Sequence, residues 1–139
     1  MNNTEIADID KAKECLCENT IALCKGCFSL VSSKRGIAPM MEFIGLGVDL
    51  EGFSAADKIV GKAVALLMVK AKISNLYAKI LSKPAIRVLD FYGVNYSYDE
   101  LCDYVVNRRG DGRCPMETAV MDIDDPELAY TVLKQKLQG

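Results

Sequence analysis

Apolar residues recur at helical spacing in several stretches of the chain. In the first, residues 4–17, they fall on one side of a helix: Ile6, Ile9, Ala12 and Leu16. The same spacing predicts a helix over residues 36–44. Capping and breaking residues predict further helices over residues 82–93, 115–121 and 127–137.

Shorter runs of apolar and β-branched residues predict strands. Residues 20–24 and 28–31 are joined by a short linker that contains Lys25 and Gly26, which predicts an antiparallel hairpin. Residues 75–81 and 94–98 predict two more strands, on either side of the helix at 82–93. Because strand, helix and strand follow each other at crossover spacing, these two strands should be parallel neighbours.

The central segment, residues 52–73, is apolar on nearly all sides and is expected inside the molecule. Two interpretations stay open. In one, a single helix is capped by Ser54, with Asp57 three residues later. In the other, residues 52–56 form a short strand and the helix begins at Asp57. Further along, residues 99–106 predict a short helix and residues 107–113 a polar loop.

This order of elements predicts an α/β protein, a three-layer α/β/α sandwich around a mixed sheet. The chain has 139 residues, of which 50% are hydrophobic, so it is long enough to bury one substantial core. We see no linker rich in proline, glycine or charge, and we expect residues 1–139 to form a single domain.

Composition narrows the function. The net charge of −2 predicts no general affinity for nucleic acid or for an anionic membrane. The longest apolar run, residues 63–69, is too short to cross a bilayer. Residues 1–10 do not resemble a signal peptide, so a cytoplasmic protein is expected. Histidine is absent, which excludes Ser-His and Cys-His dyads and leaves Asp, Glu, Lys, Tyr or Cys as acids and bases.

Four of the six cysteines lie close together near the amino end, in a C-x-C and a C-x-x-C: Cys15, Cys17, Cys24 and Cys27. Four thiolates can hold a structural zinc ion. However, two cysteines of a C-x-C on one helix point in nearly opposite directions. A metal site and a set of ordinary thiols both remain open.

Cys114 stands at the start of a predicted helix. Pro115 suits the first helical position and Glu117 falls at the third. A thiol at a helix N-terminus meets the positive end of the dipole, which favours the reactive thiolate. Arg113 and Arg108, in the loop before the helix, would act in the same direction and favour an anion there. The alternative is a cysteine that only packs as a small apolar side chain, with Glu117 opposing ionisation.

Three segments, residues 54–63, 107–120 and 122–126, closely resemble a small bacterial family of unknown function, the domain-of-unknown-function family 1893. The resemblance covers roughly residues 35–139. That family in turn resembles cytidine deaminases in fold, as a divergent branch. Deaminases carry zinc ligands in H-x-E (or C-x-E) and P-C-x-x-C motifs at two helix N-termini. The matching places here are residues 56–58 and 84–88, which retain only the proline, so the resemblance implies no catalytic zinc. We expect no cofactor.

A pocket without metal is still expected where the parallel strands end and the following helices begin. Helix N-termini and lysines there would favour an anionic or carbonyl-bearing ligand. We expect these side chains to converge on it: Ser54, Asp57, Lys58, Lys62, Ser82 and Lys83.

The sequence thus predicts a small-molecule enzyme for a nucleotide-like or anionic ligand. Cys114 would act as nucleophile, and Asp57 or Glu117 would move protons. Lys58 and Lys62 would orient the ligand. A non-catalytic ligand-binding or sensor protein is the alternative, and a purely structural module is a third option. The fold is compatible with a homodimer.

Overall fold

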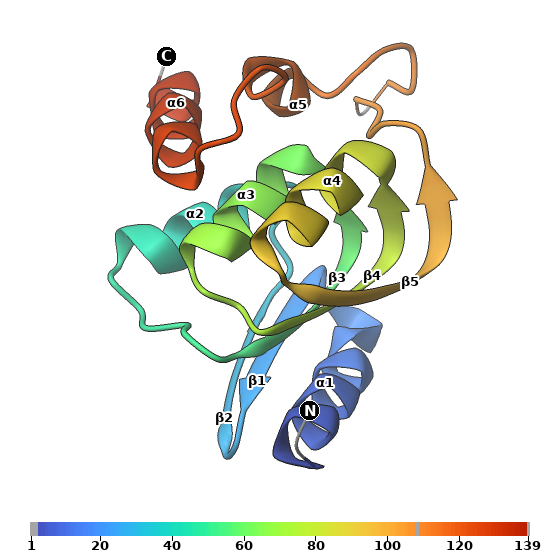
Figure 1. Cartoon of the computed structure of the whole chain (residues 1–139), viewed down its shortest axis with the longest axis vertical. Coiled ribbons are helices and arrows are strands. Elements are labelled where there is room, and N and C mark those ends of the chain that lie inside the picture. The colour runs from blue at the N-terminus through green and yellow to red at the C-terminus, as the bar shows by residue number, and fades with distance from the viewer. Residues whose placement is uncertain (1–2, 108, 139) are drawn as a thin grey trace.

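The computed structural model describes residues 3–107 and 109–138 of the chain. Figure 1 shows the elements in order along the chain. The helices are α1 (Asn3–Cys15), α2 (Ala38–Gly45), α3 (Lys62–Lys70), α4 (Lys83–Tyr92), α5 (Pro115–Ala119) and α6 (Pro126–Gln138), with a 3₁₀ turn at Leu16–Glu18. The strands are β1 (Ile21–Lys25), β2 (Phe28–Ser32), β3 (Ser54–Val60), β4 (Asn75–Ser82) and β5 (Asn95–Cys102).

The strands form one mixed sheet in the order β2-β1-β3-β4-β5. β1 is antiparallel to both of its neighbours, whereas β3, β4 and β5 run parallel. The predicted hairpin is confirmed, and Gly26 supplies the positive φ of 60° that its turn needs. The predicted crossover unit β4-α4-β5 is confirmed as well. The parallel strands all end on the side of the sheet where α5 lies (Figure 1).

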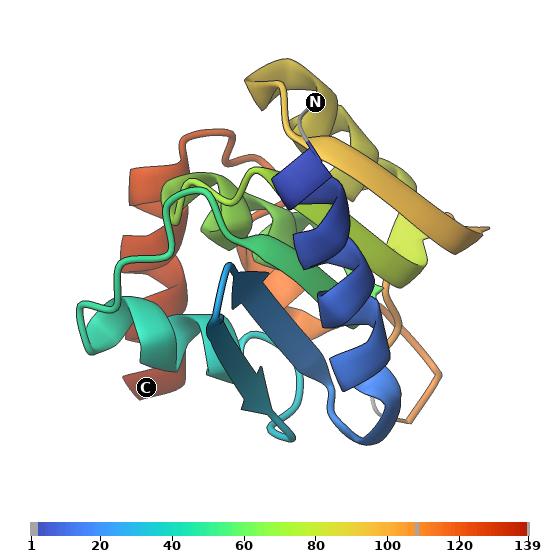
Figure 2. The same cartoon turned by 90° about the horizontal axis from the view of Figure 1, so that it is seen from below.

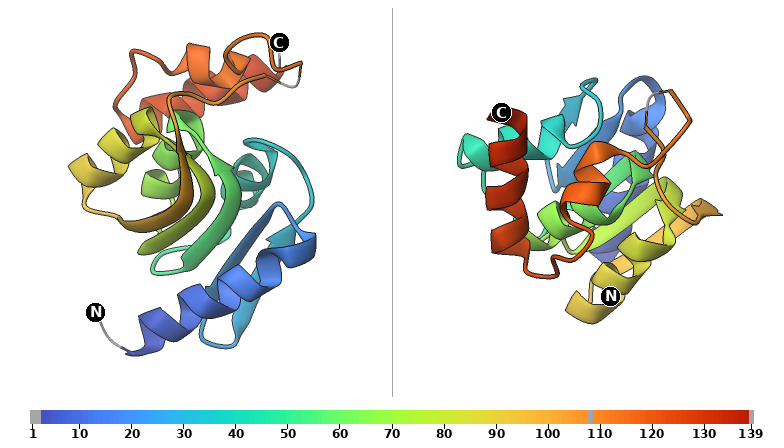
Figure 3. Two further views of the ribbon diagram at one scale, coloured as in Figure 1. Left: turned by 90° about the vertical axis from the view of Figure 1, so that its right-hand side faces the viewer. Right: turned by 90° about the horizontal axis from the view of Figure 1, so that it is seen from above.

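Helices cover both faces of the sheet, as a three-layer α/β/α sandwich requires. α1 crosses one face over β1, β3 and β4 (Figure 2). α2, α3 and α4 form the layer on the other face, and α6 packs against the outer side of α3 (Figure 3). The predicted fold class is confirmed by this arrangement.

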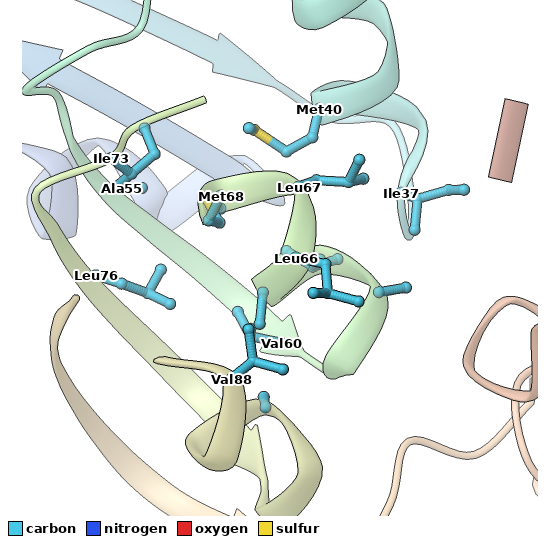
Figure 4. Packing of buried hydrophobic residues seen from close by; sticks show 14 of the residues in the cluster. Ile37, Met40, Ala55, Val60, Leu66, Leu67, Met68, Ile73, Leu76 and Val88 are labelled. Atoms are coloured by element: carbon cyan, nitrogen blue, oxygen red, sulfur yellow. The ribbon is translucent and has the colours of Figure 1, made fainter. Parts of the chain in front are cut away.

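The main core lies between the sheet and α3 (Figure 4). α3 is buried along most of its length, and Leu66, Leu67 and Met68 are completely enclosed. The apolar central segment is therefore inside the molecule, as expected. A second cluster joins α1 to the opposite face of the sheet and consists of Ala12, Leu16, Cys24, Ala56 and Tyr77.

Both interpretations of the central segment need correction. β3 extends from Ser54 to Val60, and α3 begins only at Lys62. Ser54 is therefore not a helix cap: it is the first residue of β3 and pairs with Asn75 and Cys24. β3 lies between β1 and β4 and is covered by helices on both faces. The first four residues of β3 are therefore buried on both faces, and the alternation that identifies a half-exposed strand is absent.

The predicted helix at residues 99–106 is also wrong. β5 continues to Cys102, with Ile80 opposite Glu100 and Ser82 opposite Cys102 in parallel register. β5 is an edge strand whose side chains are mostly exposed, so its sequence is polar and resembles a solvated helix. The Tyr77 hydroxyl donates a 2.5 Å hydrogen bond to Asp99 from the neighbouring strand.

Among the described residues, no helix is both long enough and apolar enough to cross a membrane.

Candidate functional site

A cleft of about 530 Å³ opens near the carboxyl ends of the parallel strands. One wall is α4, and the first turn of α3 borders it. The segment after β5, α5 and the α5–α6 connection complete the boundary. The cleft is lined by Lys62, Pro84, Arg87, Val88, Phe91, Tyr92, Asp103, Tyr104, Arg113, Glu117, Met121 and Asp124. Pockets of this size and position commonly take small molecules.

Glu117 caps the N-terminus of α3 from a distant part of the chain. Its two carboxylate oxygens each accept a 2.7 Å hydrogen bond, one from the backbone N–H of Lys62 and one from that of Ala63. A negative charge is favourable at this end of a helix. Gly61 makes the approach possible, because a Cβ atom there would overlap the Glu117 carboxylate and lie 2.7 Å from the Val105 side chain.

Lys62, the first residue of α3, is held in place by two contacts of its side chain. Its ammonium group donates a 2.8 Å hydrogen bond to the carbonyl of Met121 and lies 3.1 Å from a carboxylate oxygen of Asp124. The Lys62 side chain is only 12% exposed, whereas that of Asp124 is 88% exposed. Lys62 therefore ties the start of α3 to the connection between α5 and α6.

The start and end of α4 follow from local signals. Ser82 caps the helix, its hydroxyl accepting a 3.2 Å hydrogen bond from the backbone N–H of Ala85. Gly93 ends the helix in the left-handed conformation, with φ of 72°. One face of α4 turns toward the cleft at helical spacing and carries Pro84, Arg87, Val88 and Phe91.

The wall opposite α4, formed by the segment after β5, carries Arg113 stacked on Tyr104. The Arg113 guanidinium lies 4.9 Å from the centre of the Tyr104 ring, a cation–π distance. Val106 and Arg113 form an isolated antiparallel bridge, and the backbone N–H of Asn107 donates to the carbonyl of Gly112 over 2.8 Å. The loop thus folds back on itself and brings Arg113 over Tyr104.

The described part of the cleft lining carries three cations and three carboxylates, but the carboxylates are not paired with its arginines. Each of its three carboxylates is already satisfied: Glu117 by backbone N–H groups, Asp124 by Lys62, and Asp103 by Lys83 at 2.8 Å. Within the part of the chain that the structure describes, neither Arg87 nor Arg113 has a carboxylate partner. Both guanidinium groups can therefore attract an anion into the cleft, although Arg113 already stacks on Tyr104 and lies 3.9 Å from the Met121 sulfur.

A family model for TM1506, a domain of unknown function (DUF1893), matches residues 11–137. The chain belongs to the DUF1893 family. It is similar to the crystal structure of a DUF1893 family protein (TM1506) from Thermotoga maritima, with 30% sequence identity and a TM-score of 0.83. That similarity covers 98% of this chain and 91% of the other. No curated protein matches it.

The family resemblance drawn from the sequence motifs is thereby confirmed for DUF1893. The family match also begins earlier than the motifs did, at residue 11, and so includes the hairpin and the last turn of α1.

The predicted site residues of the DUF1893 chain do not all converge. Ser54 is buried at the amino end of β3, far along the strand from the start of α3, and its hydroxyl oxygen has no hydrogen-bond partner among the residues that the structure describes. Asp57 is buried in the middle of β3, between Ile21 and Ala78 on the adjacent strands. Lys58 is exposed on β3. None of the three lines the cleft, because the helix that would have brought them there starts later.

Other predicted residues lie in or beside the cleft. Lys62, Glu117 and Arg113 line it directly. Ser82 is the buried cap of α4, and Lys83 is one residue further on, paired with Asp103 of the lining. Arg108 lies outside the described residues.

Cys114 precedes α5 and is half-buried. Its thiol makes no capping hydrogen bond, and it is absent from the cleft lining. Cys102, expected in a helix, is the last residue of β5. The reactivity of Cys114 stays a prediction.

The structure assigns to the cleft several residues that the sequence alone did not single out, above all Arg87, Phe91 and Tyr104. Arg87 and Phe91 were detectable in principle. They lie four positions apart in a predicted helix, one cationic and one aromatic on the same face. Tyr104 carried no local signal, because its importance comes from Arg113, which folds back over it.

Asp57 has the largest electrostatic perturbation in β3. Burial raises the pKa of its carboxyl to about 8, although the backbone N–H groups of Ile59 and Lys58 act in the opposite direction. A carboxyl that is neutral near pH 7 is able to donate a proton, but Asp57 lines neither cavity described here.

The amino-terminal cysteines lie around a smaller cavity of about 180 Å³, lined in part by Cys15, Cys24 and Cys27. Burial, and next the neighbouring Cys15, raise the pKa of the Cys24 thiol to about 11. Among the described residues, no three Cys, Asp or Glu side chains are grouped so that they could hold a metal ion. The four cysteines are free thiols in this structure.

Proposed function

We propose that this DUF1893 protein binds a small anion in the cleft between α4 and α5. The observation that carries the proposal is the pair of arginines, Arg87 and Arg113, in a cleft of about 530 Å³, neither of which is paired with a carboxylate of residues 3–107 or 109–138. Arginine is well suited to carboxylate and phosphate groups because its guanidinium donates two parallel hydrogen bonds.

A divergent relationship to cytidine deaminases is part of the proposal. The order of elements agrees with that fold, and the cleft lies where α3 and α4 begin. The residues at those starts do not fit a zinc ion, however. Gly61, Lys62 and Ala63 open α3, and Lys83, Pro84 and Ala85 open α4, so neither offers a zinc ligand. Glu117 already occupies the N-terminus of α3.

Ligand binding without catalysis is favoured over an enzyme with a Cys114 nucleophile. Cys114 does not line the cleft, and Glu117 is engaged as a helix cap rather than free to move protons. The alkylation rate of each cysteine, measured as a function of pH, tests this choice. Rapid reaction of Cys114 well below pH 8.5, without reaction of Cys102, would favour the enzyme hypothesis instead. The six free thiols support a reducing, cytoplasmic location as part of the same proposal.

Titration with inorganic phosphate at low ionic strength, followed by calorimetry, tests the proposal. We expect Arg87→Ala and Arg113→Ala each to weaken phosphate binding about tenfold or more, because a hydrogen bond to a charged group contributes about 1.5–3 kcal/mol. Arg35→Ala is the matched control, since Arg35 is exposed and lies outside the cleft lining. Equal affinities for the wild type and both cleft variants would contradict the proposal.

A further inference from the structure

We infer that the ligand of this cleft carries a flat aromatic ring next to its acidic group, an inference that rests on the proposed anion site. Phe91 is the starting point. It lines the cleft, yet 80% of its side chain is exposed. It is also not alone, because the neighbouring Tyr92 lines the same cleft and is 39% exposed, so the two rings form a small apolar surface beside the charged groups.

The Phe91 ring is supported by a fixed neighbour. It meets the Tyr92 ring edge to face, with centroids 4.9 Å apart and an angle of 77° between the planes. The Tyr92 hydroxyl donates a 2.7 Å hydrogen bond to the carbonyl of Asp124 across the cleft. Tyr92 is therefore anchored to the α5–α6 connection, and it gives Phe91 a defined partner without covering it.

An anion-binding group stands one helical turn before this ring. Arg87 and Phe91 are four residues apart on the face of α4 that lines the cleft. A ligand held by Arg87 through its acidic group therefore extends beside Phe91. A flat ring is the shape that makes best use of that neighbour, because aromatic rings prefer stacked or edge-to-face contact.

The opposite wall has the same combination of ring and cation. Arg113 lies over the Tyr104 ring, so its guanidinium is oriented before any ligand arrives. A planar guanidinium also stacks on aromatic faces, which gives a flat ligand favourable contact on this side too. A single-ring anion is small enough for a cleft of about 530 Å³.

Three probes separate the contribution of the ring to the binding affinity from that of the charge: inorganic phosphate, phenyl phosphate and cyclohexyl phosphate. The last two carry the same charge and six-membered rings of similar size, but only the phenyl ring is flat and aromatic. By calorimetry on the wild-type protein, we expect phenyl phosphate to bind about three- to tenfold more tightly than cyclohexyl phosphate.

Phe91→Leu should bring the ratio of the phenyl phosphate and cyclohexyl phosphate affinities close to one, and any general effect of the variant on anion binding cancels in that ratio. Because Phe91 is exposed, the variant is expected to fold, which circular dichroism checks. Phe28→Leu is the matched control: Phe28 is 72% exposed on β2 and lies outside the cleft lining. It should retain the wild-type preference.

The outcomes are distinguishable. If phosphate binds through Arg87 but phenyl and cyclohexyl phosphate bind equally, or if Phe91→Leu keeps the preference, the inference of an aromatic ligand is wrong and the anion site stands. If none of the three probes binds, the proposed function fails and the inference fails with it.

Discussion

At the scale of single residues, the contact between Gly61 and Glu117 is the most constrained feature of the cleft. The backbone of Gly61 has φ of −102°, which any residue can adopt, so glycine is required there by space alone. We expect Gly61→Ala to lower the free energy of unfolding by about 1–3 kcal/mol, the usual cost of forcing an extra methyl group into a packed site. Urea denaturation measures it.

A double-mutant cycle identifies the cause. In a Glu117→Ala background the carboxylate is gone, so adding Gly61→Ala should cost clearly less than it does in the wild type. Gly112→Ala is the control, because the described part of the chain offers a Cβ atom there one neighbour, Asn107, at an ordinary 3.7 Å. Additive costs in the cycle would show that Glu117 is not what Gly61 accommodates.

Asp57 gives a second prediction at this scale, one of pH dependence. Its carboxyl has a pKa of about 8 in the folded chain and about 4 in the unfolded chain. Between these values the folded state holds a proton that the unfolded state has lost, so this residue makes stability fall as pH rises from about 4 to 8. The slope approaches about 1.4 kcal/mol per pH unit.

The neutral variant Asp57→Asn removes that proton linkage. We expect its melting temperature to match the wild type near pH 4 and to exceed it progressively up to pH 8. Asp122→Asn, at an exposed position, should show no such divergence. Parallel curves for wild type and Asp57→Asn across this range would mean that Asp57 is ionised in the folded protein.

At the scale of elements, prediction from sequence succeeds where the signal is local. The turn around Gly26, the Ser82 cap and the left-handed Gly93 each act within a few residues, and the hairpin and the crossover unit follow from them. The prediction of β3 fails because its apolar residues belong to different clusters. Ala55 packs in the main core and Ala56 under α1, so the first half of the strand is buried on both faces. Its sequence pattern then cannot be told apart from that of α3.

The candidate site is less predictable than the fold because few of its contacts are local in sequence. A cleft does lie where the parallel strands end, but Ser54, Asp57 and Lys58, which were expected there, do not line it. Its chemistry depends on contacts between distant residues. Glu117 meets Lys62 across 55 positions of sequence, and Arg113 reaches Tyr104 only because the intervening loop closes. One chain without related sequences contains no signal for such pairs.

At the scale of the whole molecule, one apolar core joins segments from almost the entire chain. It includes Ile21 of β1, the whole middle of α3, and Ala129 and Leu133 of α6. The cleft depends on this continuity, because one of its walls is on α4 and the other belongs to the segment that leads into α6. If α6 detached on its own, the two walls would be joined mainly by the polar contacts of Glu117, Lys62 and Tyr92.

A single cooperative unfolding transition follows from this shared core. Leu133 is completely buried, so Leu133→Ala should cost about 2–5 kcal/mol. If residues 1–139 form one domain, that loss should shift the urea midpoint of the entire transition, with its slope unchanged and with circular dichroism and tyrosine fluorescence in agreement. Leu128→Ala, on the same helix but 49% exposed, should have little effect. A separate early step in the Leu133 variant would instead show that α6 unfolds independently. The two arginine-bearing walls of the cleft would then not be held together by one core.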